Sequence, residues 1–400
     1  MNKNIFIYLF FLLFLNACND ASSKLQTGIW RATLTTESGV EIPFNFEVKG
    51  AQSTPWIEII TGEHRYKVED VRITGDSVFF VMPLFDSQFK LAFSDNLLRG
   101  NFVRSSYSMP CVATPNTDYR FPKGNIKPAF NPAGRWSVQI GRDTVIGEFA
   151  EKNNVITGSF ITPTGDYRFF EGLVADSVLM LSCFDGGFVR LFVGKMINDN
   201  TISEITMYSG NSSVQFGSAV RNAEIQLPDA YSVTTMAKGY TTLDFSFRNT
   251  DGQTVSLKDD KYKDKVVVVQ FSGSWCPNCL DETQFLSKFY NEHKDKMEVV
   301  CLAFERSADY ETAKSSALRL AKLCDVQYEV LVTCIQPIPQ KIMETMPALE
   351  NFKAFPTTVF IDKKGDVRKI HSGFSGPGTG VHFEKFVAEF TSLINELAAE

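Results

Sequence analysis

One segment constrains the fold more than any other: Val266 to Phe271 is a nearly continuous apolar run, and a pair of cysteines follows it closely. Runs of this kind are typical of strands that are buried on both faces of a parallel sheet. The motif Trp275-Cys276-Pro277-Asn278-Cys279 then leads into a stretch, to Lys294, with one apolar stripe at helical spacing. The two thiols are therefore expected where a buried strand ends and a helix begins.

A Cys-x-x-Cys pair in this position has three interpretations: half of a zinc site, an inert structural disulfide, or a redox dithiol. A zinc site needs a second pair of ligands, and Cys324 and Cys334 are ten residues apart with no nearby His. A helix N-terminus offers unpaired N–H groups and a partial positive charge that stabilise a thiolate at Cys276. Pro277 fits the first turn, and Cys279 follows one turn later as the resolving thiol. The pattern therefore favours a redox dithiol.

Alternating strand and helix signals continue to the end of the chain, so we expect an α/β domain over residues 240–400. Its expected elements are a hairpin at 243–247 and 254–257, strands at 299–304, 328–332, 357–361 and 367–371, and helices at 313–323 and 383–399. Cys301 falls in a strand and is expected in the core.

Residues 26–220 consist of short alternating runs separated by turn pairs, which predicts an all-β half, either sandwich or barrel. Three sequence fragments recur in the same order: Gly28-Ile-Trp30 as Gly134-Arg-Trp136, Asp76-Ser-Val78 as Asp176-Ser-Val178, and Phe85-Asp86 as Phe184-Asp185. Their offsets are 106, 100 and 99 residues. We therefore predict two copies of one unit, at 26–121 and 133–220.

The Gly-x-Trp openings resemble those of lipocalin-type barrels, although a core Trp in any sandwich gives the same pattern. Residues 26–220 gather no recognisable catalytic set, so we interpret this half as a binding or positioning module. Whether Cys111 and Cys183 pair, and whether Cys324 and Cys334 pair, is left open by the sequence.

The first 17 residues are predicted to be a signal peptide. Lys3 precedes an apolar run from Ile5 to Leu15, which spans only ~17 Å as a helix against a ~30 Å bilayer core. The ending Leu15-Asn16-Ala17-Cys18 resembles a bacterial lipobox. That resemblance implies cleavage before Cys18, a lipid on Cys18, and a chain anchored to the membrane in the cell envelope, facing the periplasm.

Composition excludes two other classes. The net charge is −6 with no long basic run after the first residues, which argues against nucleic-acid binding. The four His do not stand at metal-ligand spacing, so we predict no metal site.

Residues 240–400 resemble the thioredoxin-like domain of the TlpA/ResA family of extracytoplasmic disulfide reductases. The resemblance rests on the Trp-Cys-Pro-Asn-Cys motif, Glu282, Phe355-Pro356-Thr357-Thr358 and Asp362-Lys-Lys-Gly-Asp366. Gly373 to Thr379 is similar to lipoprotein members from Bacteroidetes-like bacteria. The family implies reduction of protein disulfides with no cofactor beyond the redox-active disulfide Cys276–Cys279. It also implies a membrane electron donor of the CcdA or DsbD type, and exported disulfide-bearing substrates such as apocytochrome c.

Three further residues are assigned to the site. Glu282 shares a helix face with Cys279, so it either faces inward as the proton acceptor for that thiol or faces water as a first-turn carboxylate. The resemblance implies a cis bond at Phe355–Pro356, with the Phe355 backbone pairing with substrate; a trans bond on an edge strand is the alternative. Trp275 is either a partly exposed platform at the site or a cap on the core.

Two other functions remain as alternatives. A thiol peroxidase of the AhpC/TSA-like redoxin class needs a Pro-x-x-x-Thr/Ser-x-x-Cys loop, and no cysteine here has that spacing. A non-catalytic surface binding protein would have a vestigial redox domain. The sequence leaves open the direction of electron flow, the physiological substrate, the ligand of the β half, the choice of membrane and the oligomeric state.

Overall fold

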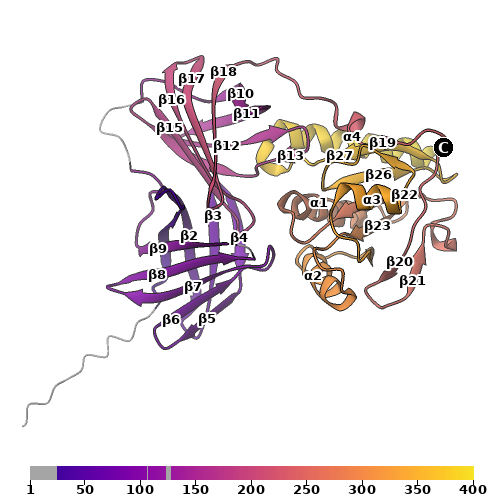
Figure 1. Ribbon diagram of the computed structural model, residues 1–400, viewed down its shortest axis with the longest axis horizontal. Helices are drawn as coiled ribbons and strands as arrows, with labels where there is room; N and C mark the ends of the chain where they lie inside the picture. The colour runs from indigo at the N-terminus through magenta and orange to yellow at the C-terminus, as the bar shows by residue number, and fades with distance from the viewer. Residues whose placement is uncertain (1–24, 106, 123–127) are drawn as a thin grey trace, which may run out of the picture.

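Two nine-stranded antiparallel sheets form the N-terminal half of the chain and pack beside a mixed α/β domain (Figure 1). The computed structural model describes residues 25–105, 107–122 and 128–400. Both sheets curl into barrel-like units, and the predicted fold class, all-β followed by a thioredoxin-like α/β domain, is confirmed.

The first sheet has the order β4-β3-β2-β1-β9-β8-β7-β6-β5. Its strands are β1 (Gly28–Thr35), β2 (Glu41–Ala51), β3 (Thr54–Thr61), β4 (His64–Val68), β5 (Asp70–Thr74), β6 (Ser77–Val81), β7 (Ser87–Ser94), β8 (Leu97–Arg104) and β9 (Tyr107–Pro115). The second sheet has the order β11-β10-β18-β17-β16-β15-β14-β12-β13, and β11 also pairs with β12 to close it. Its strands are β10 (Gly134–Ile140), β11 (Asp143–Lys152), β12 (Val155–Thr162), β13 (Gly165–Asp166), β14 (Phe170–Ala175), β15 (Val178–Phe184), β16 (Val189–Asn198), β17 (Thr201–Ser209) and β18 (Ser213–Arg221).

The two β units share one strand plan. In each, the first strand pairs with both the second and the ninth strand of its unit. Trp30 and Trp136 occupy the same place, both fully buried, and each indole N–H donates to the carbonyl four residues earlier, at 2.9 and 2.7 Å. Gly28 and Gly134 precede them with φ near +110°, a conformation that favours glycine. This is the arrangement expected of a duplicated unit.

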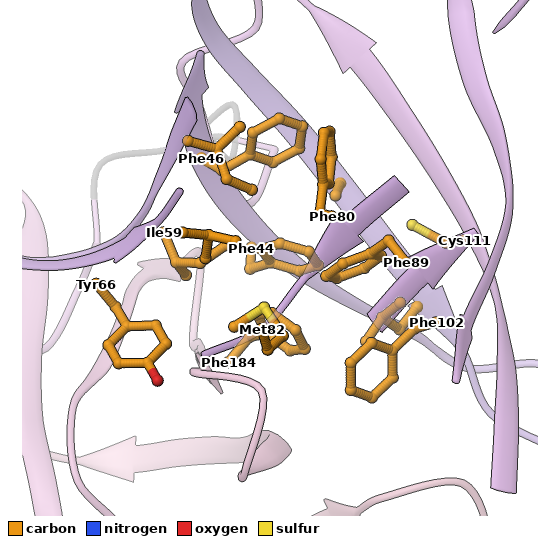
Figure 2. Close-up of a cluster of buried hydrophobic side chains, with 14 of the residues drawn as sticks. Phe44, Phe46, Ile59, Tyr66, Phe80, Met82, Phe89, Phe102, Cys111 and Phe184 are labelled. Carbon is orange, nitrogen blue, oxygen red and sulfur yellow. The ribbon is translucent and has the colours of Figure 1, made fainter. Parts of the chain in front are cut away.

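Aromatic side chains fill the interior of the first β unit (Figure 2). Phe44, Phe89 and Phe102 come from three of its own strands, and Phe184 enters from β15 of the second unit. The Phe184 ring stacks on Phe44 with centroids 4.1 Å apart and meets Phe102 edge-on at 5.3 Å. The apolar core of the first β unit therefore extends into the second unit, which also has a core cluster of its own.

The C-terminal domain is built on a seven-stranded sheet of order β21-β20-β24-β23-β22-β26-β27. Its strands are β20 (Ser246–Asn249), β21 (Thr254–Ser256), β22 (Val266–Ser272), β23 (Met297–Ala303), β24 (Glu329–Val332), β26 (Thr357–Ile361) and β27 (Val367–Ser372), and a separate short pair joins β19 (Thr235–Met236) to β25 (Leu349–Glu350). The helices are α1 (Pro277–His293), α2 (Tyr310–Leu323), α3 (Pro339–Thr345) and α4 (Val381–Ala399).

The central strands β22, β23 and β24 run parallel, and β26 and β27 continue the sheet antiparallel. Helices α1 and α4 pack on one face through Leu286, Phe289 and Phe390. Helix α3 packs on the other face through Ile342. The start of α1 consequently lies at the carboxyl end of β22, at the edge of the sheet that faces the β units (Figure 1).

The predicted elements of this domain are present, with two additions, helix α3 and the short strand β25. Helix α3 was not expected, because its seven residues are too few to show a helical period and two prolines stand at its start. In the described part of the chain all seven cysteines are unpaired, so neither of the two pairs left open by the sequence forms a disulfide. Among the described helices, none is long and apolar enough to cross a membrane.

Candidate active site

Cys276 is the N-cap residue of α1, and its sulfur lies between two backbone groups. The Cys279 N–H donates to Sγ of Cys276 at 3.2 Å, and the thiol of Cys276 lies 3.5 Å from the carbonyl oxygen of Phe355. Pro277 occupies the first helical position, where its missing N–H costs nothing. An unpaired helix N–H aimed at a sulfur stabilises its thiolate form, so the geometry suits a nucleophile at Cys276.

Cys279 lies one turn further along α1 and is fully buried, whereas Cys276 retains 6% of its exposure. Burial, followed by the hydrogen bond with Cys276, raises the pKa of the Cys279 thiol well above its ordinary value. Cys279 therefore stays protonated at neutral pH, and it would need a proton acceptor to act as a nucleophile.

Glu282 is fully buried beneath the dithiol, which is the inward of its two possible orientations. The Thr358 hydroxyl donates to one carboxylate oxygen at 2.7 Å, and the Gln270 amide donates to the other at 2.8 Å. Burial raises the pKa of Glu282 to about 7, and these two hydrogen bonds oppose the rise. A carboxyl with such a pKa accepts or releases a proton readily near neutral pH.

The opposite wall of the site is formed by the Phe355–Pro356 segment. The bond between these residues is cis, and the Gly373 N–H donates to the Pro356 carbonyl at 2.8 Å. Trp275 is half-buried, its indole N–H donates to the Phe304 carbonyl at 2.8 Å, and its ring meets Phe355 edge-on at 5.3 Å. Trp275 and Phe355 thus make a partly exposed aromatic surface beside Cys276.

A buried carboxylate fixes the loop that precedes Cys276. Glu305 accepts from the Ser274 N–H at 2.9 Å and from its hydroxyl at 2.8 Å. Burial raises the pKa of Glu305, and the two Ser274 bonds oppose that rise. The sequence signal for this contact was a carboxylate directly after the strand next to β22, which is the position from which a side chain reaches the same sheet edge.

Residues of the second β unit also reach the dithiol helix, and sequence reasoning did not anticipate them. Arg168 forms two hydrogen bonds with the Asp281 carboxylate, both at 2.8 Å, and one with Asp185 at 2.6 Å. The Asn278 side chain of the dithiol motif donates to the Asp166 carbonyl at 3.1 Å. The available signal was Asp281, a carboxylate two residues after the second thiol, but its partner lies 113 residues away in the chain.

Two further sequence predictions concern the lipidation site and metal binding. Cys18, the predicted lipidation site, lies outside the described residues. Over residues 25–105, 107–122 and 128–400, no three His, Cys, Asp or Glu side chains gather as a metal-binding group.

The C-terminal domain is similar in sequence to known proteins. Residues 237–382 match the family model described as Redoxin. The thioredoxin-like protein YneN of Bacillus subtilis is 28% identical over 136 residues, which is 34% of this chain and 72% of that protein. The thiol-disulfide oxidoreductase ResA of Halalkalibacterium halodurans is 23% identical over 160 residues, covering 39% of this chain and 76% of that protein.

A solved thioredoxin domain of a thiol-disulfide oxidoreductase from Bacteroides vulgatus is 22% identical, with a TM-score of 0.29. The alignment covers 38% of this chain and 99% of that domain. Residues 237–382, which match the family model, carry the dithiol at the start of α1 and the Phe355–Pro356 loop that faces it. By the family-model match and these two relatives, the C-terminal domain is similar to thioredoxin-fold proteins of the TlpA/ResA-like type, and we call it the redoxin domain after the matching model.

Proposed function

We propose that this chain is a membrane-tethered, extracytoplasmic thiol-disulfide oxidoreductase that reduces protein disulfides through Cys276 and Cys279. The observation that carries the proposal is the pairing of an N-cap thiol with a buried thiol one helical turn later. A buried carboxyl with a pKa of about 7 lies beneath them. The names of the matching relatives support the same reaction class.

In the proposed reaction the Cys276 thiolate attacks one sulfur of a substrate disulfide. A Cys276–substrate disulfide forms, and the other substrate sulfur leaves as a thiolate that takes a proton from solvent. Cys279, after losing its proton, then attacks Sγ of Cys276 and releases the second substrate thiol. The substrate gains two electrons and two protons, and the enzyme is left with the Cys276–Cys279 disulfide.

Glu282 is assigned as the acceptor of the Cys279 proton. Both groups are fully buried on the inner face of α1, and the proximity of the Glu282 charge contributes to the raised pKa of Cys279. The Thr358 and Gln270 donors hold the carboxylate in place while its protonation changes. Because the resolving thiol has no direct access to bulk water, an internal acceptor removes the need for solvent to enter the site.

The cellular setting follows from the N-terminal sequence and the family. Lipid attachment at Cys18 after signal-peptide cleavage would hold the chain on the periplasm-facing surface of the cell envelope. A membrane thiol carrier of the CcdA or DsbD type would return two electrons to the enzyme disulfide. Exported proteins with disulfides, such as apocytochrome c, would be the substrates, and Trp275, Phe355 and Pro356 would contact them beside Cys276.

Insulin reduction by the mature chain, with a small thiol as the electron source, tests the proposal. We expect turnover in the wild type and a loss of about 10³-fold or more in Cys276→Ser, because the nucleophile is gone. Cys279→Ser should accumulate the mixed disulfide, which mass spectrometry detects. Peroxide consumption without disulfide reduction would indicate a thiol peroxidase, and no turnover of either kind would indicate a binding protein.

A further inference from the structure

We propose that the second β unit restricts the dithiol to extended disulfide-bearing segments by covering one side of Cys276, and that Arg168 is the positioning residue that holds this cover. The cover is defined as residues 165–168 and 185–187 of the second β unit. The proposal rests on the proposed function and names its substrate class. Arg168 touches no reacting atom, so its effect on substrates acts through the position of the cover.

The cover contacts the dithiol motif directly. The Asn278 amide donates to the Asp166 carbonyl at 3.1 Å, and both Pro277 and Asn278 are buried. Gly187 lies so close to the Pro277 ring that a side-chain carbon added at Gly187 would meet the ring at 2.6 Å. The Pro277–Asn278 side of the dithiol is therefore closed to any substrate.

A buried charge cluster joins the cover to the dithiol helix. Arg168 is 1% exposed and bridges Asp281 on α1 to Asp185, which follows β15. The Asp166 carboxylate adds a bond from the Gly376 N–H at 2.6 Å. A guanidinium that binds one carboxylate through two parallel bonds fixes both distance and orientation, which an apolar contact does not. The cluster therefore sets one alignment of the cover on α1.

The exposed part of Cys276 is small, at 6% of the residue. It is bordered by Trp275 and Phe355, and the Arg306 guanidinium lies 5.6 Å above the Trp275 ring. Arg306 also lies 3.4 Å from the Ser105 hydroxyl of the first β unit. Both β units therefore contact residues around the dithiol, the second unit at Pro277 and Asn278 and the first unit through Ser105 at Arg306.

These borders select by shape. An extended segment is about 4.8 Å wide in the direction of its backbone hydrogen bonds and can lie along the Phe355 main chain in the manner of an added strand. A disulfide on the surface of a folded domain brings a broad surface with it, which would collide with the cover before its sulfur reaches Cys276. Access to the attacked sulfur is one of the terms that set the exchange rate, so the cover acts on rate and not on thiol chemistry.

The test compares two substrates with the full mature chain: native insulin, and a disulfide that joins two short unstructured peptides. In Arg168→Gln the cover loses its charge link, and we expect kcat/KM for insulin relative to the peptide to rise about tenfold. Arg168→Lys, which keeps the charge without the planar fork, should restore part of the selectivity. Arg221→Gln is the matched control, because Arg221 binds the Ala133 carbonyl and the Trp136 ring within the same β unit.

A second variant separates cover position from loss of folding. Gly187→Ala leaves every charge in place and forces the cover away from Pro277, so the same ratio should rise, by about threefold. A purely structural defect would lower kcat/KM equally for both substrates and leave their ratio unchanged. An unchanged ratio in both Arg168→Gln and Gly187→Ala overturns the proposal, as does a wild type that reduces insulin as readily as the peptide. Failure of the proposed function looks different, because then neither substrate turns over in any variant.

Discussion

The two β units and the redoxin domain bury different kinds of side chain. Away from their interfaces the β units bury mainly aromatic and aliphatic groups, such as Trp30, Trp136 and Phe46. The redoxin domain buries polar groups beneath its dithiol, including Gln270, Glu282 and Thr358, all at 0% exposure. Apolar burial contributes to folding wherever it occurs, whereas a buried ionised carboxyl costs stability unless it is paired and hydrogen-bonded. The comparison teaches that stability and turnover in this chain are carried by different residues and should respond to different substitutions.

The largest expected effect is on stability, and it concerns the buried tryptophans of the two β units. Trp136→Ala should lower the free energy of unfolding by about 3–5 kcal/mol, since it leaves a cavity and strands the Pro132 carbonyl. Trp30→Ala should have an effect of the same size, because the Trp30 indole is equally buried and makes the equivalent hydrogen bond. Urea unfolding measures both. Insulin reduction per folded molecule should not change, and a fall in turnover without a loss of stability would break the comparison.

Glu282→Gln tests the redox side. Burial raises the pKa of Glu282 to about 7, so its carboxyl is ionised and ready to accept a proton only above that pH. The rate at which Cys279 resolves the mixed disulfide should rise through pH 7 in the wild type. In the variant it should be about 10²-fold lower and independent of pH in this range. Stopped-flow mixing gives the rate, and Glu292→Gln, an exposed residue on the same helix, is the control.

Glu282→Gln should lower the rate of resolution but raise the stability of the folded chain at alkaline pH. Because the folded-state pKa of Glu282 lies above its ordinary value of 4.5, its contribution favours folding at acid pH and is lost as pH rises through about 7. At pH 8 Glu282→Gln should therefore be more stable than the wild type, by about 3 kcal/mol. Unfolding curves at pH 5 and pH 8 reveal the difference. Equal free energies of unfolding for the wild type and Glu282→Gln at pH 5 and at pH 8 would show that burial does not destabilise the ionised carboxylate.

A smaller effect is expected at the aromatic surface beside the dithiol. Trp275→Ala removes one face of the substrate contact, and a stacking contribution of about 1 kcal/mol corresponds to a fivefold rise in KM for insulin. The value of kcat should stay within twofold, since Cys276 keeps its helix N–H donor. A loss confined to kcat would instead indicate that Trp275 positions the Cys276 sulfur and does not contact the substrate.

The smallest effect is expected where the first β unit meets the redoxin domain at the surface. Arg319 and Asp86 form an ion pair at 2.7 Å, and both side chains are about half exposed. Arg319→Gln should change the free energy of unfolding by less than about 1 kcal/mol, because solvent and salt screen such pairs. A large effect on stability or on substrate selection would give the first unit the role that we assign to the second.

Much of the redoxin domain was predictable because its signals are local. The apolar run of β22 and the apolar stripe on α1 each indicate one element from a short stretch of sequence. The motif between them predicts where Cys276 and Cys279 lie, at the start of the helix. Helical spacing placed Glu282 on the same face as Cys279 but left its inward and water-facing orientations open, and only the structure shows that it is buried. Helix α3 was missed because seven residues are too few to establish a period.

The contact between the β half and the dithiol was not predictable in the same way. Arg168 and Asp281 are 113 residues apart, and neither stands in a pattern that names its partner. Each residue alone looks like an ordinary surface charge, and only the fold shows that both are buried. The recurrence of Gly-x-Trp correctly indicated equivalent positions in the two β units, but recurrence says nothing about how two units pack.

Phe184 belongs to one β unit by covalent connection and to the other by packing, with ring contacts at 4.1, 5.3 and 5.5 Å to three phenylalanines of the first unit. A chain shortened to a single copy would open a hole where this ring sits and expose the ring itself on the other fragment. Deletion of either repeat is therefore penalised on both sides of the cut. The two β units therefore depend on each other for a filled interior, and neither is expected to be stable when it is expressed alone.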